Sequence, residues 1–236
     1  MNIKVFLILL CSYQLSFSQV PFQVTIDKEV GSGSFNGRNI TEDIDGNIFA
    51  VSTGGFGLSQ LHLTKVNKQG FIEWDTLYSF TPFAEFKPKI IPAHDGGVII
   101  GCVSFSYPLP DQDSIQDIML WKINENGIIE WQRIIESYDF EGAITSKDGN
   151  YLILGSELEK GLNIICCKVN INGELIWRKI ISNPKQGTWS LTFSEVDGYI
   201  YISGQKVTTS PNSVRDNYIY QVDNNGNLVW EITLRK

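Results

Sequence analysis

The side chains that could carry chemistry in this chain are few, and carboxylates are the commonest of them. Closely spaced acidic pairs occur at Asp111 with Asp113 and at Asp139 with Glu141. Two carboxylates that flank a sugar ring can act as general acid and as base or nucleophile in glycoside hydrolysis. Solvated acidic loops without such a role are the more ordinary interpretation of either pair, so no catalytic residue is assigned.

Histidines and metal-ligand patterns are also sparse. His62 lies in an apolar run and His94 precedes an Asp-Gly turn, which supplies neither a zinc-type cluster nor a base for a Gly-x-Ser-x-Gly nucleophile. Fragments of calcium-loop spacing occur at 43–47 and 223–227, but no later Glu completes them. We expect no metal and no cofactor.

Three cysteines follow the N-terminal region: Cys102, Cys166 and Cys167. An odd number cannot pair completely. The adjacent Cys166 and Cys167 lie in a strand-like run, where successive side chains point to opposite faces, so a disulfide between them would require a distorted turn. We interpret all three as small core residues.

A repeat sets the elements that must position these side chains. Gly-x-x-x-Trp occurs four times, each time after a strand-like run that ends near Asn or Asp. Its members are Gly70 and Trp74, Gly127 and Trp131, Gly173 and Trp177, and Gly226 and Trp230. Asp-Gly also recurs, at 45–46, 95–96, 148–149 and 197–198. Both markers indicate tight turns between strands, so each unit of about 50 residues holds four strands.

Repeated four-stranded units with two apolar faces predict an all-β fold, a β-propeller of about four four-stranded antiparallel blades. The strands are almost continuously apolar, as expected for strands covered on both faces. We expect late lysines of the third strands, such as Lys122 and Lys168, to extend toward the rim. One domain at 19–236 is expected to hold blades at 37–80, 87–138, 141–183 and 189–236, after an extra strand at 22–30 that could help to close a ring.

The repeats resemble the tryptophan-docking blades of pyrroloquinoline-quinone-type propellers. They resemble more closely the secreted bacterial propeller repeats in which Asp-Gly-Gly and a Lys-x-Asn/Asp-x-x-Gly-x-x-x-Trp segment recur. The segments 94–101 and 120–131 carry that pattern. The resemblance implies a blade structure and no particular activity, because its motifs consist of turn and core residues. Relatives commonly have more than four blades, so a closed ring, a half-ring completed by another copy and a fragment of a longer propeller all stay open.

The first 18 residues have the layout of a bacterial secretory signal peptide. Lys4 precedes an apolar run at 5–10, and small residues stand at Ser16 and Ser18. We expect cleavage after Ser18 and a secreted, cell-surface or periplasmic protein. Lipoprotein anchoring at Cys11 stays open, although Leu10 is bulkier than such sites favour. No later run approaches the roughly 20 apolar residues of a membrane span, so no membrane insertion is expected after cleavage.

The charge balance and the lengths of the connections limit the kinds of partner the protein can bind and the face that binds them. The formal net charge is −7 without a basic cluster, which argues against nucleic acid as a partner. Turns between first and second and between third and fourth strands are short and share one face of the disc, whereas the other connections vary and share the opposite face. Variable loops over a rigid scaffold commonly carry function. The candidate ligand-binding residues on that face are Phe105, Tyr107, Asp111, Asp113, Tyr138, Trp189 and Arg215.

We therefore predict a secreted, non-enzymatic binding or scaffolding module for a surface glycan or an extended peptide or protein. A carbohydrate-active enzyme with a carboxylate pair on the long-loop face is one alternative. A half-propeller completed by self-association is another. The aromatic residues of that face could equally pack beneath the loops as additional core.

Overall fold

A computed structural model describes residues 39–53, 60–79, 84–106, 115–137, 139–157, 163–182, 188–207 and 215–234. The expected signal peptide and the expected extra strand at 22–30 lie outside the described residues. No helix among the described residues is long and apolar enough to cross a membrane.

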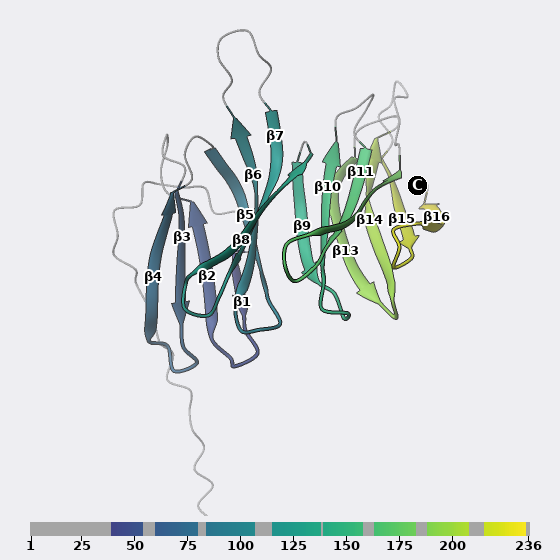
Figure 1. Ribbon diagram of the computed structural model, residues 1–236. Coiled ribbons are helices and arrows are strands. Elements are labelled where there is room, and N and C mark those ends of the chain that lie inside the picture. The colour runs from purple at the N-terminus through teal and green to yellow at the C-terminus, as the bar shows by residue number, and fades with distance from the viewer. Residues whose placement is uncertain are drawn as a thin grey trace, which may run out of the picture.

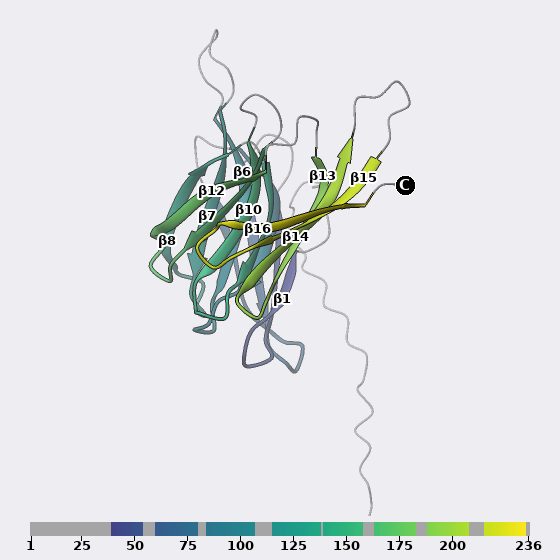
Figure 2. The same ribbon diagram turned by 90° about the vertical axis from the view of Figure 1, so that its right-hand side faces the viewer.

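Four antiparallel sheets make up the described structure, each with four strands in chain order (Figures 1 and 2). The prediction of an all-β fold with four four-stranded antiparallel units is confirmed. The first sheet holds β1 (Ile40–Glu42), β2 (Ile48–Thr53), β3 (Gln60–Val66) and β4 (Ile72–Ser79), and the second holds β5 (Ala84–Pro92), β6 (Val98–Ser106), β7 (Ile115–Ile123) and β8 (Ile129–Glu136). The third holds β9 (Asp139–Thr145), β10 (Tyr151–Glu157), β11 (Asn163–Val169) and β12 (Leu175–Ser182), and the fourth holds β13 (Thr188–Val196), β14 (Tyr199–Val207), β15 (Arg215–Val222) and β16 (Leu228–Leu234).

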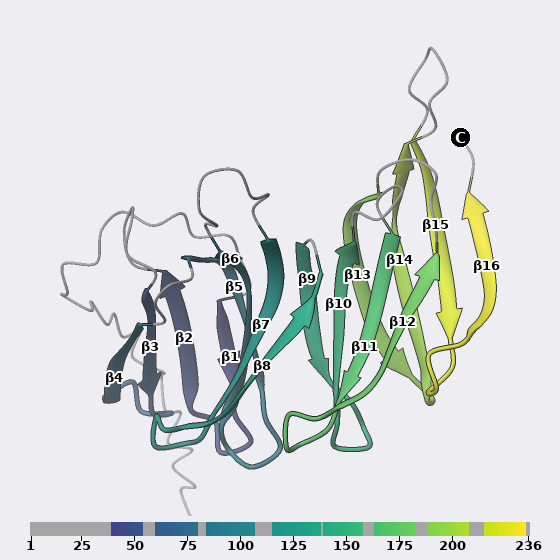
Figure 3. The same ribbon diagram turned by 45° about the horizontal axis from the view of Figure 1, so that its top comes forward.

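The sheets stand face to face in an open arc. The main contacts between sheets run in chain order, with β5 against β1 and β2, β9 against β5 and β6, and β13 against β9. Figure 3 shows the first and fourth sheets at opposite ends of this row. The described residues therefore form no closed ring of four sheets.

One turn design joins the third and fourth strands of every sheet. In the second sheet, Asn124 Oδ1 accepts hydrogen bonds from the backbone N–H groups of Asn126 and Ile128, both at 3.0 Å. Gly127 closes the turn at φ +79°, a left-handed conformation that favours glycine. Asn67, Asn170 and Asp223 make the same pair of bonds, which explains the recurring Asn/Asp-x-x-Gly.

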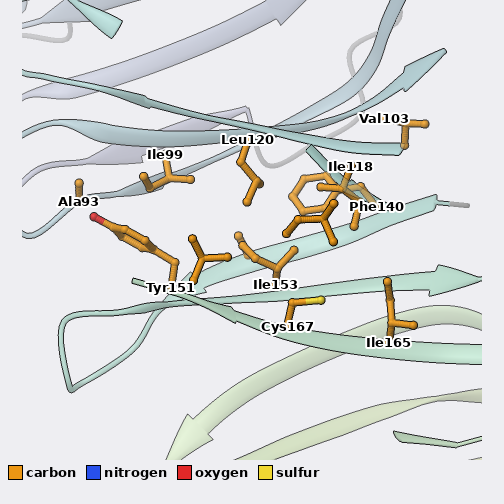
Figure 4. Close-up of a cluster of buried hydrophobic side chains, with 13 residues drawn as sticks. Ala93, Ile99, Val103, Ile118, Leu120, Phe140, Tyr151, Ile153, Ile165 and Cys167 are labelled. Carbon is orange, nitrogen blue, oxygen red and sulfur yellow. The ribbon is translucent and has the colours of Figure 1, made fainter. Parts of the chain in front are cut away.

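Three apolar clusters fill the spaces between successive sheets. Figure 4 shows the middle cluster, where Ile118 and Leu120 of β7 face Ile153 and Cys167 of the third sheet. Neighbouring residues of one strand belong to different clusters because their side chains alternate between the two faces of the sheet. Cys167 lies in the middle cluster and Cys166 in the cluster between the third and fourth sheets. Both are free and buried, so their interpretation as core residues is confirmed.

The repeated tryptophans join each sheet to the next. Trp131 Nε1 donates a hydrogen bond to the carbonyl oxygen of Ile171, 2.8 Å away in the turn of the third sheet. Trp74 reaches Glu125 O in the same way at 2.9 Å, and Trp177 reaches Asn224 O at 3.2 Å. The three indole rings are half-buried against the apolar clusters. Each joint therefore combines apolar contact with one directed hydrogen bond.

The third-strand lysines extend to the turns at the short-turn rim, as expected, but they are buried on the way there. Lys122 is 1% exposed, and its Nζ bonds to Asp95 and Glu130. Burial alone would lower the pKa of Lys122, but the bonds to these two carboxylates outweigh burial and raise it. Lys168 is also buried and bonds to Asp148 and to Asn224 of the next sheet. A partly exposed carboxylate of the Asp-Gly turn thus binds each of these buried ammonium groups where the lysine meets the rim.

Candidate functional site

The short turns lie at one edge of the sheets, and the strand ends at the opposite edge are here called the long-connection edge. Three of the candidate ligand-binding residues have described backbones there. Phe105 pairs with Ala84 and Gln116 in the second sheet, while Trp189 pairs with Gln205 in the fourth. Arg215 pairs with Val207 in the fourth sheet. Tyr107, Asp111, Asp113 and Tyr138 lie outside the described residues. The structure places Trp189 and Arg215 at the same edge of one sheet and Phe105 two sheets away.

A row of polar residues crosses the second sheet at the long-connection edge. Ser104 pairs with Glu85 on one side and with Asp117 on the other, and Asp117 pairs with Glu136. Directly opposed residues on antiparallel strands share one face, with Cβ atoms about 4.5–5.5 Å apart. Ser104 is buried, Asp117 is half-buried and Glu136 is exposed. The row therefore leads from the interior of the edge to solvent, and it ends in two opposed carboxyl groups.

The two carboxyl groups of this row have different surroundings. Burial raises the pKa of Asp117, and the nearby charge of Glu136 raises it further, against a lowering by the backbone N–H of Ser137. The net pKa of Asp117 is above its usual value. Glu136 lies in solvent on the last strand of the sheet. Two carboxyl groups in unequal environments can divide the roles of proton donor and acceptor.

The acidic pair Asp139 and Glu141 has a different geometry. Phe140 pairs with Gly155 and Gly142 with Leu154, so Glu141 is the extra residue of a β-bulge. Bulges leave backbone groups without ladder partners. Here Lys89 Nζ from β5 donates to the carbonyl oxygens of Phe140, at 3.3 Å, and of Glu141. Asp139 Oδ1 accepts from the backbone N–H of Phe140 at 2.9 Å. The pair therefore flanks a bulge and does not form an opposed pair of carboxylates.

Basic groups at this edge are engaged by the fold. Arg178 Nη2 bonds to Glu157 at 2.7 Å and to the carbonyl oxygen of Glu136 at 3.3 Å, which links the second and third sheets. Lys89 serves the bulge carbonyls. In the second and third sheets, five carboxylates share the edge with these two cations: Asp117, Glu136, Asp139, Glu141 and Glu157. This part of the edge is therefore acidic.

The histidines and the calcium-like fragments form hydrogen bonds within or between sheets. His62 Nε2 bonds to Asp75, which also accepts from Thr64 Oγ1 at 3.2 Å. His94 Nε2 lies 3.2 Å from the carbonyl oxygen of Ser146. Asp43 Oδ1 accepts the backbone N–H groups of Asp45 and Asn47 and so caps its own turn. Within the described ranges no three His, Cys, Asp or Glu side chains come together as a metal site.

Sequence reasoning missed the row of Ser104, Asp117 and Glu136. Its members are far apart in the chain and belong to no motif. Only the strand register brings them together, and a shift of one residue would move each side chain to the other face. Counting residues back and forward from the Gly-x-x-x-Trp of the second sheet is the one signal in the sequence that could have placed these residues opposite one another.

Neither a family model nor a curated protein sequence matches the chain, but solved structures do. An ulvan lyase of polysaccharide lyase family PL25, bound to -[GlcA(1-4)Rha3S]-, matches with a TM-score of 0.55 at 12% identity over 86% of this chain and 57% of the lyase. A xylan beta-1,4-xylosidase from Bacillus halodurans C-125 has a TM-score of 0.46 at 12% identity, over 78% of this chain and 39% of the enzyme. An alpha-L-arabinofuranosidase from Clostridium thermocellum has a TM-score of 0.47 at 12% identity, over 84% of this chain and 73% of the enzyme.

The chain has a β-propeller fold. At these identities the likeness shows the fold alone. The chain spans less than two thirds of the length of the ulvan lyase and of the xylosidase. The propeller architecture places the long-connection edge where the strands of several sheets end together, so that edge is the candidate site.

Proposed function

We propose that this protein is a carbohydrate-active propeller that holds a saccharide at the long-connection edge, with Asp117 as the acid and base and Glu136 as the nucleophile. The supporting observation is the opposed pair itself, in which burial raises the pKa of Asp117 while Glu136 remains solvated. A propeller with a related fold holds a saccharide in the ulvan lyase structure. Saccharides are therefore the ligand class to test first.

In this proposal the protonated form of Asp117 donates its proton to the oxygen of the scissile glycosidic bond while the Glu136 carboxylate attacks the anomeric carbon. Water then hydrolyses the resulting glycosyl ester of Glu136, and Asp117 takes up the proton of that water. Retaining glycosidases place the two carboxyl groups about 5–5.5 Å apart. Asp117 and Glu136 are directly opposed in the ladder, and this proximity favours the close-pair geometry over the wider inverting one.

The charge of the edge favours a neutral saccharide. Glu136 and Glu157 would repel carboxylate or sulfate groups on a sugar, and Arg178 is already bonded to Glu157. The expected ligand therefore differs in charge from the uronate and sulfate units bound to the ulvan lyase. The binding-only module predicted from the sequence is the second candidate, and it differs by the absence of turnover.

Neutral and anionic polysaccharides, assayed for binding and for new reducing ends, test the proposal. Asp117→Asn and Glu136→Gln should lower turnover about 100-fold or more while binding changes little. Glu125→Gln, an exposed carboxylate in a short turn at the opposite edge, is the matched control and should leave turnover unchanged. Turnover should also decline as pH rises through the raised pKa of Asp117, because the acid must be protonated.

The outcomes separate the candidates. Binding without turnover, with both variants weakening affinity, would favour the binding-only module. Binding of no saccharide, or turnover that both variants leave intact, would contradict the proposal.

We also propose that residues 1–18 are removed and that the protein works outside the cytoplasm, at the cell surface or in the periplasm. The layout of Lys4, the apolar run and Ser18 supports this. N-terminal sequencing of the exported protein should find Gln19 first. A modified Cys11 at the N-terminus would instead indicate a lipoprotein.

A further inference from the structure

The three joints between sheets use the same donor and acceptor positions. In each, the Trp of one sheet donates from Nε1 to the carbonyl oxygen of the residue that follows the Asn or Asp of the next turn. The acceptors are Glu125, Ile171 and Asn224. The glycine of that turn lies against the same ring, as Gly173 does against Trp131. Each docked Trp is therefore covered by the Asn/Asp-x-x-Gly turn of the next sheet.

The fourth sheet presents the same donor at the end of the arc. Trp230 pairs with Gln221 and Gln221 with Tyr201, just as Trp177 pairs with Lys168 and Lys168 with Leu152. The side chain of Trp230 is 37% exposed, and its ring contacts Tyr201 at 6.1 Å between centroids. Figures 2 and 3 show β16 at the free end of the arc.

The burial of the residue four positions after each Trp gives a direct comparison. Tyr78, Ile135 and Ile181 are 8%, 3% and 5% exposed, whereas Leu234 is 53% exposed. The register places further apolar side chains on the same face as Trp230, here called the outer face. Its apolar members are Val196, Tyr199, Tyr201, Ile219, Trp230, Ile232 and Leu234. This face corresponds to those that the next sheet covers elsewhere in the chain.

The first sheet presents the matching acceptor. Asn67 builds the same turn, with bonds from its Oδ1 to the N–H groups of Gln69 and Phe71, and Gly70 has φ +87°. Lys68 follows Asn67, and so its carbonyl occupies the position that accepts the Trp at each internal joint. Lys68 is exposed. His62 and Thr64 of the same sheet are buried, whereas Leu77, which pairs with His62 on the same face, is 42% exposed.

We propose that the outer face of one copy docks on the first sheet of a second copy, with Trp230 donating to the carbonyl oxygen of Lys68. The contact is head to tail, so two copies can make it twice around a two-fold axis. Four sheets from each copy would then close a ring of eight. Head-to-tail contacts close into a ring when the rotation fits, and eight blades lie within the usual range for propellers.

The polar side chains of the outer face suit contact between separately folded molecules. Gln221 replaces the buried lysine of the other sheets and donates to Tyr201 Oη at 2.6 Å. It therefore needs no carboxylate partner in either the free or the docked state. Interfaces between proteins that exist separately are more polar than a core. This inference concerns assembly and is independent of the saccharide proposal.

Sedimentation equilibrium over a range of concentrations tests the proposal. The wild-type chain should change from the mass of one copy to about twice that mass, with no larger species. Trp230→Phe keeps the ring and removes the Nε1 donor. One hydrogen bond corresponds to about 2- to 12-fold in affinity, and two bonds per dimer make the expected weakening about 5- to 150-fold. Trp230→Arg should leave only single copies.

The matched control is Ile180→Arg, which adds the same charge at a 50% exposed apolar residue of β12 outside the outer face. It should dimerise like the wild type. A single-copy mass at every concentration would show that something else covers the outer face, or nothing, and would overturn the proposal. Dimerisation that neither Trp230→Phe nor Trp230→Arg weakens would also overturn the proposal. Polymers that lengthen with concentration would contradict the closed ring.

Discussion

Gly173 lies beneath the indole ring of Trp131, so close that a Cβ atom on this glycine would stand 2.7 Å from ring atom Cδ2. The same turn offers the carbonyl of Ile171 to Trp131 Nε1. Gly173 also has φ +80°, so it is required for two separate reasons, the turn conformation and the space for the ring. The repeated Gly-x-x-x-Trp therefore contains both halves of the joint, and Gly127, Gly173 and Gly226 each receive the Trp of the preceding sheet.

Gly173→Ala should cost more stability than Gly149→Ala, and the difference measures the packing of the joint. Both glycines have similar left-handed φ, +80° and +87°, and so both substitutions carry about 1–2 kcal/mol of backbone strain. A Cβ at Gly149 would meet nothing within 4 Å, whereas at Gly173 it meets the ring, which adds about 1–3 kcal/mol. Urea unfolding of the two variants measures both losses. Equal losses would contradict the close contact.

Trp131→Ala should lower the free energy of unfolding by about 3 kcal/mol, near the lower end of aromatic truncations because the ring is only half-buried. Trp230→Ala should cost less than about 1 kcal/mol in the single-copy state, since its ring is exposed and packs mainly on Tyr201. Both are measured by chemical unfolding at low protein concentration. Similar losses at the two positions would show that Trp230 is already docked.

The parts of the fold that sequence reasoning could predict depend on local chemistry. Asn124 and Gly127 specify a turn through their own hydrogen bonds and φ, and they do so wherever the sheet lies. Four copies of this turn therefore predict four sheets. The alternation that separates Cys166 from Cys167 is likewise a property of the strand itself.

The rest depends on long-range register and on neighbouring sheets. The sequence indicates that Lys122 extends toward the rim, but not that it is buried or that its partner is Asp95, 27 residues away. Asp117 and Glu136 become a pair only through the ladder between β7 and β8. Loop lengths predict the edge at which Phe105 and Trp189 lie, but they cannot show which side chains meet there.

Cys166 and Cys167 should not react with a thiol reagent at pH 8 in the folded protein. Both side chains are fully buried, and burial raises the pKa of Cys167 to about 12 and that of Cys166 still further. The reactive thiolate is therefore scarce as well as inaccessible. Alkylation followed by peptide mass spectrometry should find both cysteines unmodified before unfolding and modified in denaturant. A peptide with the two sulfurs joined would contradict the alternation of their side chains.

Asp148 should make stability depend on acid between about pH 4 and pH 2. Burial alone would raise its pKa, but hydrogen bonds, above all from Lys168, lower it to about 2 from the usual 3.8. A carboxyl whose folded pKa is depressed stabilises the fold above its unfolded pKa, and that contribution disappears as pH falls toward its folded pKa. Asp148→Asn should therefore reduce stability at neutral pH and flatten the dependence in this window, as followed by thermal unfolding.

Asp197→Asn is the matched control for that measurement. Asp197 holds the equivalent Asp-Gly position in the fourth sheet, where the third strand carries Gln221 in place of the lysine. Without an ammonium partner, this substitution should leave the slope of stability between pH 4 and pH 2 close to that of the wild type. If Asp197→Asn flattened the slope as much as Asp148→Asn, the acid dependence would arise from the turn itself, and the buried bond between Lys168 and Asp148 would not be its cause.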